Sequence, residues 1–195
     1  INSSACGYDG MGRLALHADT FYWRDYALKG APIVAEGAST PTRFYVRTPM
    51  GELLYAVDLE SKTATFYHYD KTGSTLALTD TSGTVTDSYA YLPYGKLLAH
   101  QGSSTQPFTY LGRDGVYTSP ATNGVYLMGS RWYAATNARF LSRQQAWPPR
   151  SLEEPRRINP YQYALGNPVT NTNPTGQWDA SCDVENLALI DAAIL

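Results

Sequence analysis

The sequence predicts an all-β fold built from antiparallel hairpin repeats. Helix signals are scarce until the last dozen of its 195 residues. Short runs of alternating, β-branched and aromatic residues recur instead, each closed by a glycine, a proline or an Asp/Ser-Gly pair. Short strands at a spacing of about ten residues, joined by tight turns, are typical of antiparallel all-β architectures.

The clearest strand signals follow one another through the middle of the chain. They predict strands over residues 44–47, 52–57, 63–69, 75–79 and 84–91. Thr-Pro-Met-Gly at 48–51 and Asp-Thr-Ser-Gly at 80–83 are turn signatures, because the glycine tolerates positive φ and the aspartate can accept turn amides. We expect tyrosine and tryptophan side chains to alternate between the interior and the exterior of the resulting wall.

Two later segments differ from this pattern. Residues 148–157 combine prolines with mixed charges, which predicts a solvent-exposed loop. Apolar residues at helical spacing over 184–195 predict a helix in the C-terminal tail.

Composition excludes several classes of protein. With 15 basic and 17 acidic side chains, the formal charge of −2 argues against a nucleic-acid-binding surface. No stretch approaches the ~18 apolar residues of a membrane span. Cys6 and Cys182 are too few for a disulfide scaffold, and whether they pair stays open. A chain that starts at Ile1 without a signal-like run is expected to be a processed or excised piece, or to have its targeting signal elsewhere.

Three turn motifs repeat along the chain. They read YDxxGRL at 8–14, YDxxGS at 69–74 and YxYxPYG at 89–95. In each the tyrosine ends a strand and the glycine lets the chain reverse. One such unit cannot bury its own face, so the units must stack on neighbours, as in repeat proteins.

These motifs, together with IVAEG at 33–37 and FYHYDKTGS at 66–74, resemble those of YD-repeat (Rhs) proteins. GVYLMGSRWY at 124–133, RFLS at 139–142 and NPYQYALGNPV at 159–169, closing with NPTG at 173–176, resemble the Rhs repeat-associated core. The resemblance runs from about Tyr8 to Gly176, nearly the whole chain.

The resemblance implies a spiral β-sheet that forms a hollow shell, with the core as a plug and an enclosed C-terminal cargo, usually a toxin. It divides the chain into shell wall (1–107), closing core (108–176) and variable tail (177–195). It also implies preceding YD-repeat segments of the same or a partner chain as partners, and a secreted or cell-surface location in bacteria. The motif residues that match the family are Tyr8, Asp9, Gly12, His68, Tyr69, Asp70, Gly73, Pro93, Gly95, Arg131, Phe140, Asn167, Pro168, Pro174 and Gly176.

The family's core often carries an aspartyl self-cleavage activity, which needs two carboxylates that share a proton. At the two matching positions this chain has Gln144 and Asn173. An amide cannot take up or hold a proton near neutral pH, so we predict no enzymatic activity and no cofactor. The neighbouring Arg139 is expected to hold a backbone or aromatic partner. Asp179 and Asp183, which follow the closing motif, are interpreted as part of a solvated linker.

Two alternatives remain open at this point. One is a self-cleaving core with an atypical acid pair. The other is an adhesion or glycan-binding wall that uses aromatic series such as Phe21-Tyr22-Trp23. His68 is interpreted as structural, and His17 and His100 have no acidic or cysteine neighbours at ligand spacing, so we predict no metal site.

Overall fold

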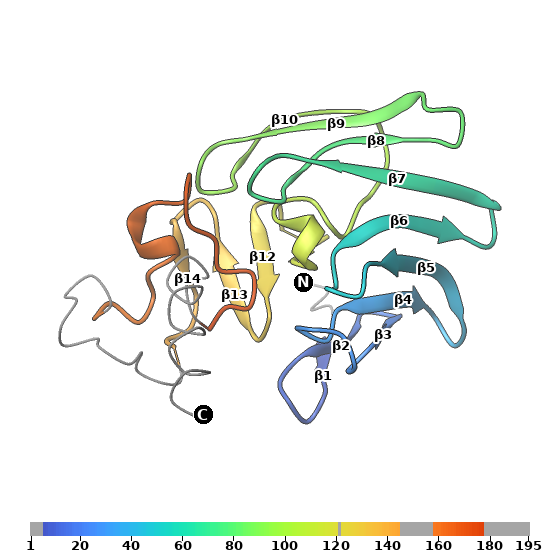
Figure 1. The fold of residues 1–195 in the computed structure, drawn as a ribbon. Helices are drawn as coiled ribbons and strands as arrows, with labels where there is room; N and C mark the ends of the chain where they lie inside the picture. Colours follow the sequence, from blue (N-terminus) through green and yellow to red (C-terminus); the bar gives the residue numbers. More distant parts are fainter. Residues whose placement is uncertain (1–5, 121, 145–157, 178–195) are drawn as a thin grey trace, which may run out of the picture.

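A computed structural model describes residues 6–120, 122–144 and 158–177, and its regular structure is almost entirely antiparallel β (Figure 1). Ten strands form the first sheet in sequence order. They are β1 (Cys6–Tyr8), β2 (Leu14–His17), β3 (Thr20–Arg24), β4 (Ile33–Gly37), β5 (Pro41–Arg47), β6 (Leu53–Asp58), β7 (Thr63–Tyr69), β8 (Thr75–Thr79), β9 (Val85–Tyr91) and β10 (Leu97–Gln101).

A second, four-stranded sheet follows and also runs in sequence order. Its strands are β11 (Tyr117–Thr118), β12 (Val125–Met128), β13 (Arg131–Ala134) and β14 (Arg139–Phe140). Helical structure in the described part of the chain is limited to the short 3-10 turns η1 (Gly112–Asp114) and η3 (Ala164–Gly166). We call residues 107–177 of the described chain the plug and the ten-stranded sheet the wall.

All five predicted strands are confirmed as β5 to β9. The strand β7 and the strand β8 have the predicted bounds, whereas β5 starts three residues earlier, at Pro41. The turn at 48–51 forms as predicted, with the Gly51 N–H donating to the Thr48 carbonyl at 2.9 Å. The predicted loop at 148–157, the predicted tail helix and Cys182 lie outside the described residues.

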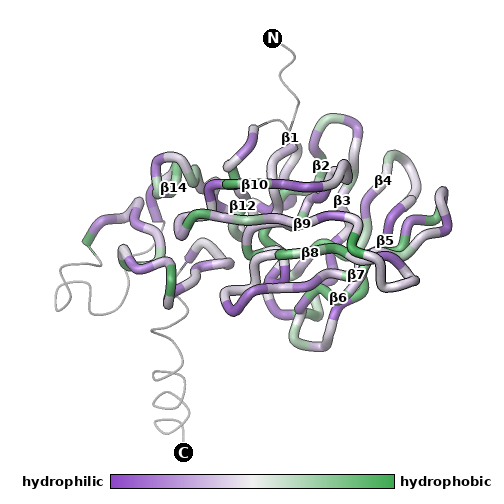
Figure 2. Tube along the Cα trace, turned by 90° about the horizontal axis from the view of Figure 1, so that it is seen from above, coloured by the Kyte–Doolittle hydropathy of each residue, from purple (hydrophilic) through white to green (hydrophobic). Residues whose placement is uncertain are grey.

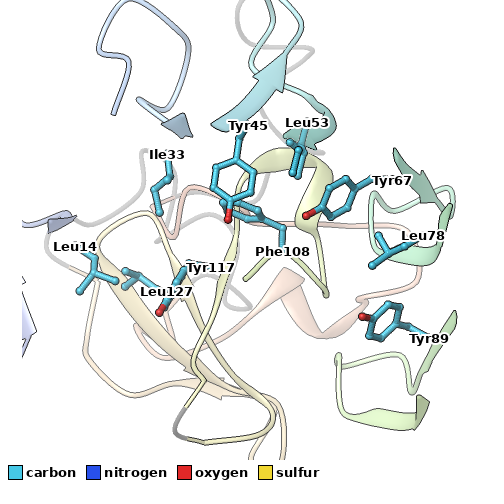
Figure 3. Close-up of a cluster of buried hydrophobic side chains, with 11 residues drawn as sticks. Leu14, Ile33, Tyr45, Leu53, Tyr67, Leu78, Tyr89, Phe108, Tyr117 and Leu127 are labelled. Atoms are coloured by element: carbon cyan, nitrogen blue, oxygen red, sulfur yellow. The ribbon is translucent and has the colours of Figure 1, made fainter. Parts of the chain in front are cut away.

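The wall curves around the plug, so that the concave face of the sheet and the plug share one hydrophobic core (Figures 1 and 3). Leucine and tyrosine side chains from the wall converge there with Phe108, Tyr117 and Leu127 of the plug. Phe108 is fully buried, and its ring meets that of Tyr45 edge-on at a centroid distance of 4.8 Å. This shared core crosses the predicted boundary at 107/108, while a second buried cluster, which includes Tyr126 and Tyr133, lies within the plug. As a domain boundary, 107/108 stays a prediction.

A 22-residue period underlies the last hairpins of the wall. It separates Tyr45 from Tyr67 and Tyr67 from Tyr89, which are all buried on the concave face. The same period separates the turn glycines 51, 73 and 95, all of which have positive φ. Equivalent residues therefore recur at the same height on alternate strands, and the three turns lie at the same end of the sheet.

The prediction that tyrosines alternate between interior and exterior is wrong for β7 and β9. Tyr67 and Tyr69 stack on each other, as do Tyr89 and Tyr91, and all four belong to or pack against the core that the wall and the plug share. Residues two apart in a strand share a face, so a YxY motif places both rings on one side. Figure 2 shows hydrophobic and hydrophilic residues mixed along the strands of the wall.

Candidate functional site

The two positions at which the family's acids are replaced lie in the same corner of the plug. Gln144 follows β14, and its backbone N–H donates to the Pro160 carbonyl at 3.0 Å. Asn173 opens the closing turn and is only 2% exposed. Its carbonyl accepts the Gly176 N–H at 3.2 Å, which closes the Asn-Pro-Thr-Gly turn.

Arg131, at the start of β13, connects these two segments. Its Nη1 donates to the same Pro160 carbonyl at 3.0 Å, and its Nε donates to the Gly176 carbonyl. The guanidinium carbon lies 3.6 Å from the centroid of the Phe140 ring. The side chain is 4% exposed, and two carbonyl dipoles and an aromatic face contribute to the stabilisation of its positive charge.

In this corner, Arg131 provides hydrogen-bond donors, and Gln144 and Asn173 provide neutral amides. The Asn173 Oδ1 is buried and has no hydrogen-bond partner in the described part of the chain. Arginine stays protonated in proteins, so Arg131 cannot act as a general base. The arrangement can therefore anchor the chain that leaves the plug. Across residues 6–120, 122–144 and 158–177, no group of three His, Cys, Asp or Glu side chains is placed to hold a metal ion.

Arg139 lies outside this corner on the surface. Its side chain is exposed, and its guanidinium lies 5.6 Å from the centroid of the Tyr161 ring, an aromatic partner as expected. The backbone of Arg139 forms a β-bridge with Gln162. Asp179 and Asp183 lie outside the described residues.

The plug sits on the end of the wall where the three turn glycines lie. The Gly73 carbonyl accepts the backbone N–H of Arg113 in η1 at 3.0 Å. The Gly51 carbonyl accepts Nη1 of Arg47 at 3.0 Å, and the Arg47 guanidinium lies 5.0 Å from the Phe108 ring centroid. Burial lowers the pKa of Arg47 to about 10, which still leaves it charged at neutral pH.

The third turn, Leu-Pro-Tyr-Gly at 92–95, is held by tyrosines of the plug. Their hydroxyls donate to three consecutive backbone carbonyls: Tyr110 to Pro93 at 3.2 Å, Tyr133 to Tyr94 at 2.8 Å and Tyr126 to Gly95 at 2.7 Å. Burial raises the pKa of Tyr110 to about 12 and those of Tyr126 and Tyr133 further. All three hydroxyls therefore stay neutral donors at physiological pH.

The YD motifs have a local structural role. Oδ1 of Asp70 accepts the backbone N–H groups of Thr72 and Ser74, each at 2.9 Å, and Oδ1 of Asp9 does the same for the residues two and four positions on. Gly12 and Gly73 have φ of 74° and 93°, which glycine adopts at little cost. Each aspartate thus fixes its own hairpin turn.

The remaining motif residues also make structural contacts. The Tyr69 hydroxyl donates to the Leu53 carbonyl at 2.8 Å. His68 is exposed, and its Nε2 shares a hydrogen bond with Thr79 Oγ1 at 2.9 Å. The Asn167 backbone N–H donates to the Ala164 carbonyl at 2.8 Å, ahead of Pro168. These contacts give the motif residues structural roles in the fold.

One polar cluster was not visible in the sequence. Asp87 on β9, 3% exposed, accepts hydrogen bonds from His100 Nε2 and from the Ser104 N–H, both at 3.0 Å. The His100 ring stacks on Tyr89 at a centroid distance of 4.4 Å. Only the pairing of β9 with β10 brings Asp87 to His100, so spacing along the chain gave no signal. The cluster ties the segment after β10 to the wall.

We expect Asp87→Asn to lower the free energy of unfolding by about 2 kcal/mol at pH 7, because a buried acceptor loses its charge. Burial alone would raise the pKa of Asp87, but the bonds from Ser104 and His100 outweigh it and hold the pKa below its ordinary value. The stabilisation is therefore present above the unfolded pKa of about 3.9 and is lost as pH falls through the folded value. Urea unfolding measures the free energy of unfolding between pH 7 and pH 2, and this free energy should fall less steeply with acid in the variant than in the wild type. An equally steep fall in both proteins would contradict the prediction.

Comparisons with known proteins agree with this architecture. The profile of the family described as Teneurin YD-shell matches residues 38–169. The tRNA3(Ser)-specific nuclease WapA of Bacillus spizizenii is 31% identical over 140 residues, which cover 70% of this chain and 6% of the relative. The tRNA nuclease WapA of Bacillus subtilis is 31% identical over 116 residues, or 58% of this chain and 5% of the relative. The chain thus spans about one twentieth of these relatives.

Solved structures show the same fold. A Photorhabdus luminescens Tc holotoxin pore with a mutated TccC3 superposes with a TM-score of 0.60 at 18% identity, over 90% of this chain and 9% of the other. A TcdB2–TccC3–TEV crystal structure gives a TM-score of 0.58 at 16% identity, again over 90% and 9%. Among the described residues, no helix is long and apolar enough to cross a membrane.

Proposed function

Because this chain belongs to the Teneurin YD-shell family, we propose that it forms the last turns of a YD shell and the plug that closes the shell around a C-terminal cargo. The observation that carries the proposal is the shared core: Phe108 of the plug is fully buried against Tyr45 of the wall. A plug that packs into the concave face of the wall would close the end of the shell that these strands form. This role needs packing and hydrogen bonds, and no catalytic residue.

The preceding YD-repeat strands, from the same or a partner chain, are the proposed partners at the edge formed by β1. In the part of the chain that the structure describes, this strand pairs with β2 and is the first strand of the ten-stranded sheet. Backbone N–H and C=O groups along such an edge bind a further strand. The wall is also anchored there from inside, since Trp132 Nε1 donates to the Tyr8 hydroxyl at 3.1 Å. That contact makes Trp132 part of the wall–plug packing.

The cargo follows the plug and is toxin-like in this proposal, with a secreted or cell-surface location in bacteria. The names of the WapA relatives support the proposal, because they describe nucleases and this chain covers only about one twentieth of those proteins. The replacement of both acids by Gln144 and Asn173 further suggests that the cargo stays covalently attached. The core would then act as a tether.

We expect the full-length protein to give one uncut mass after purification. The missing carboxylates leave no pair of groups to activate water and polarise the carbonyl. Intact-mass spectrometry over several days at pH 5 and pH 7 is the measurement. Fragments that break after Gly176 or Trp178 would contradict the proposal and support the self-cleaving alternative.

We expect the double variant Gln144→Asp/Asn173→Asp to gain a cut near this junction, because both positions already lie in the corner organised by Arg131. Each single variant supplies one carboxylate and should stay intact, since the dyad requires two. Intact mass of the three full-length variants tests this. A double variant that folds but stays whole would show that the tether does not depend on the missing acids.

A further inference from the structure

We propose that Arg131 is the positioning residue that holds the chain at the point where the C-terminal segment leaves the plug. This inference rests on the proposed function, because it assigns to one side chain the retention of the segment that the shell encloses. We call Gly129, Arg131 and Phe140, acting on Pro160 and Gly176, the exit clamp.

Arg131 joins segments that lie far apart in the sequence. Its two donated bonds reach the Pro160 carbonyl, 29 residues away, and the Gly176 carbonyl, 45 residues away. Phe140 covers the guanidinium at 3.6 Å. A guanidinium presents several donors in a rigid fork, so one side chain can fix two carbonyls at a defined separation.

The backbones of two turns also lie in close contact at this point. A Cβ on Gly129, which has φ of +57°, would lie 2.0 Å from the Thr175 carbonyl oxygen. A Cβ on Gly176, with φ of +68°, would lie 2.2 Å from the Met128 carbonyl oxygen. The turn between β12 and β13 and the closing turn therefore cross in direct backbone contact, and both glycines are required for it.

The Arg131 bonds and the glycine crossing together locate the point where the chain leaves the plug. The closing turn is held both by the glycine crossing and by the hydrogen bond from Arg131. Since Gly176 is the last residue of the closing motif, the clamp acts on the final turn before the tail begins. Non-covalent contacts with the plug can therefore fix the position of the chain at Gly176, just before the C-terminal segment begins.

The test is hydrogen–deuterium exchange on the full-length protein with its native C-terminal segment. Arg131→Met keeps the aliphatic stem and removes both donors, while Arg139→Met is the matched control at an exposed arginine. We expect exchange of the amides over 172–177 to rise by at least about 30-fold in Arg131→Met. The Thr75 amide, which is bonded to the Thr109 carbonyl in the wall–plug core, should change less than about 3-fold, and Arg139→Met should change neither.

Uniform acceleration at 172–177 and at Thr75, or no acceleration at either, would overturn the proposal. If Arg131→Met does not fold, the same comparison is made with Arg131→Lys, which keeps the charge and can reach one carbonyl; local acceleration supports the clamp and uniform acceleration overturns it. The intact mass of each sample separates the two hypotheses. A wild-type protein cut after Gly176 would contradict the uncut shell, whereas the exchange pattern alone decides the role of Arg131.

Discussion

Replacing Gly95 by alanine should lower the free energy of unfolding by about 3 kcal/mol. A Cβ at this residue would lie 2.6 Å from two ring carbons of Tyr110, in the turn that three plug tyrosines hold by its carbonyls. Overpacking of this kind typically costs about 1–3 kcal/mol. The φ of +86° adds about 1 kcal/mol for a residue with a side chain. Urea unfolding followed by tyrosine and tryptophan fluorescence measures the difference.

Gly83→Ala is the matched control. Gly83 has nearly the same φ, +83°, yet nothing lies within 4 Å of the position of its Cβ. The control therefore carries the backbone strain alone, and we expect a loss of about 1 kcal/mol. Equal losses at the two glycines would show that the contact between the 92–95 turn and the plug contributes nothing to stability.

Phe108→Ala should have the largest effect, a loss of about 3–5 kcal/mol, because it leaves a cavity where wall and plug meet. The ring is fully buried between Tyr45 and Arg47, and the Phe108 carbonyl accepts the Thr75 hydroxyl at 2.9 Å. Since the wall and the plug share this core, both should lose stability together. Chemical denaturation monitored by fluorescence and by far-UV circular dichroism should show the same shifted midpoint.

Phe66→Ala provides the comparison for this variant. Phe66 is half-buried on the other face of the sheet, where its ring lies 5.3 Å from that of Tyr55. The same truncation there should cost about 1 kcal/mol, because solvent already reaches the site and little cavity forms. A Phe108→Ala loss no larger than that of Phe66→Ala would contradict a core shared by wall and plug.

Much of the wall could be predicted because its signals are local. The turn glycines, the aspartates of the YD motifs and the alternation of the strands each act within a few residues, and β5 to β9 follow from them. For the candidate site, the sequence predicted only the two positions at which the family's acids are replaced, and not that these positions lie in one corner of the plug. Gln144 and Asn173 were found from the order of motifs, whereas their common link through Arg131 was not.

The sequence alone thus determined the fold class and the hairpin order, since turn chemistry and strand periodicity are encoded by neighbouring residues. The replacement of the two acids rests on the resemblance to the Rhs core and stays a prediction. Tertiary structure alone decided which partners the buried polar groups have. Arg131 meets Gly176 across 45 residues, and His100 meets Asp87 only through the pairing of β9 with β10. The curvature of the wall brings Phe108 to Tyr45. Such contacts depend on how whole strands pair and bend, and no local pattern specifies that geometry.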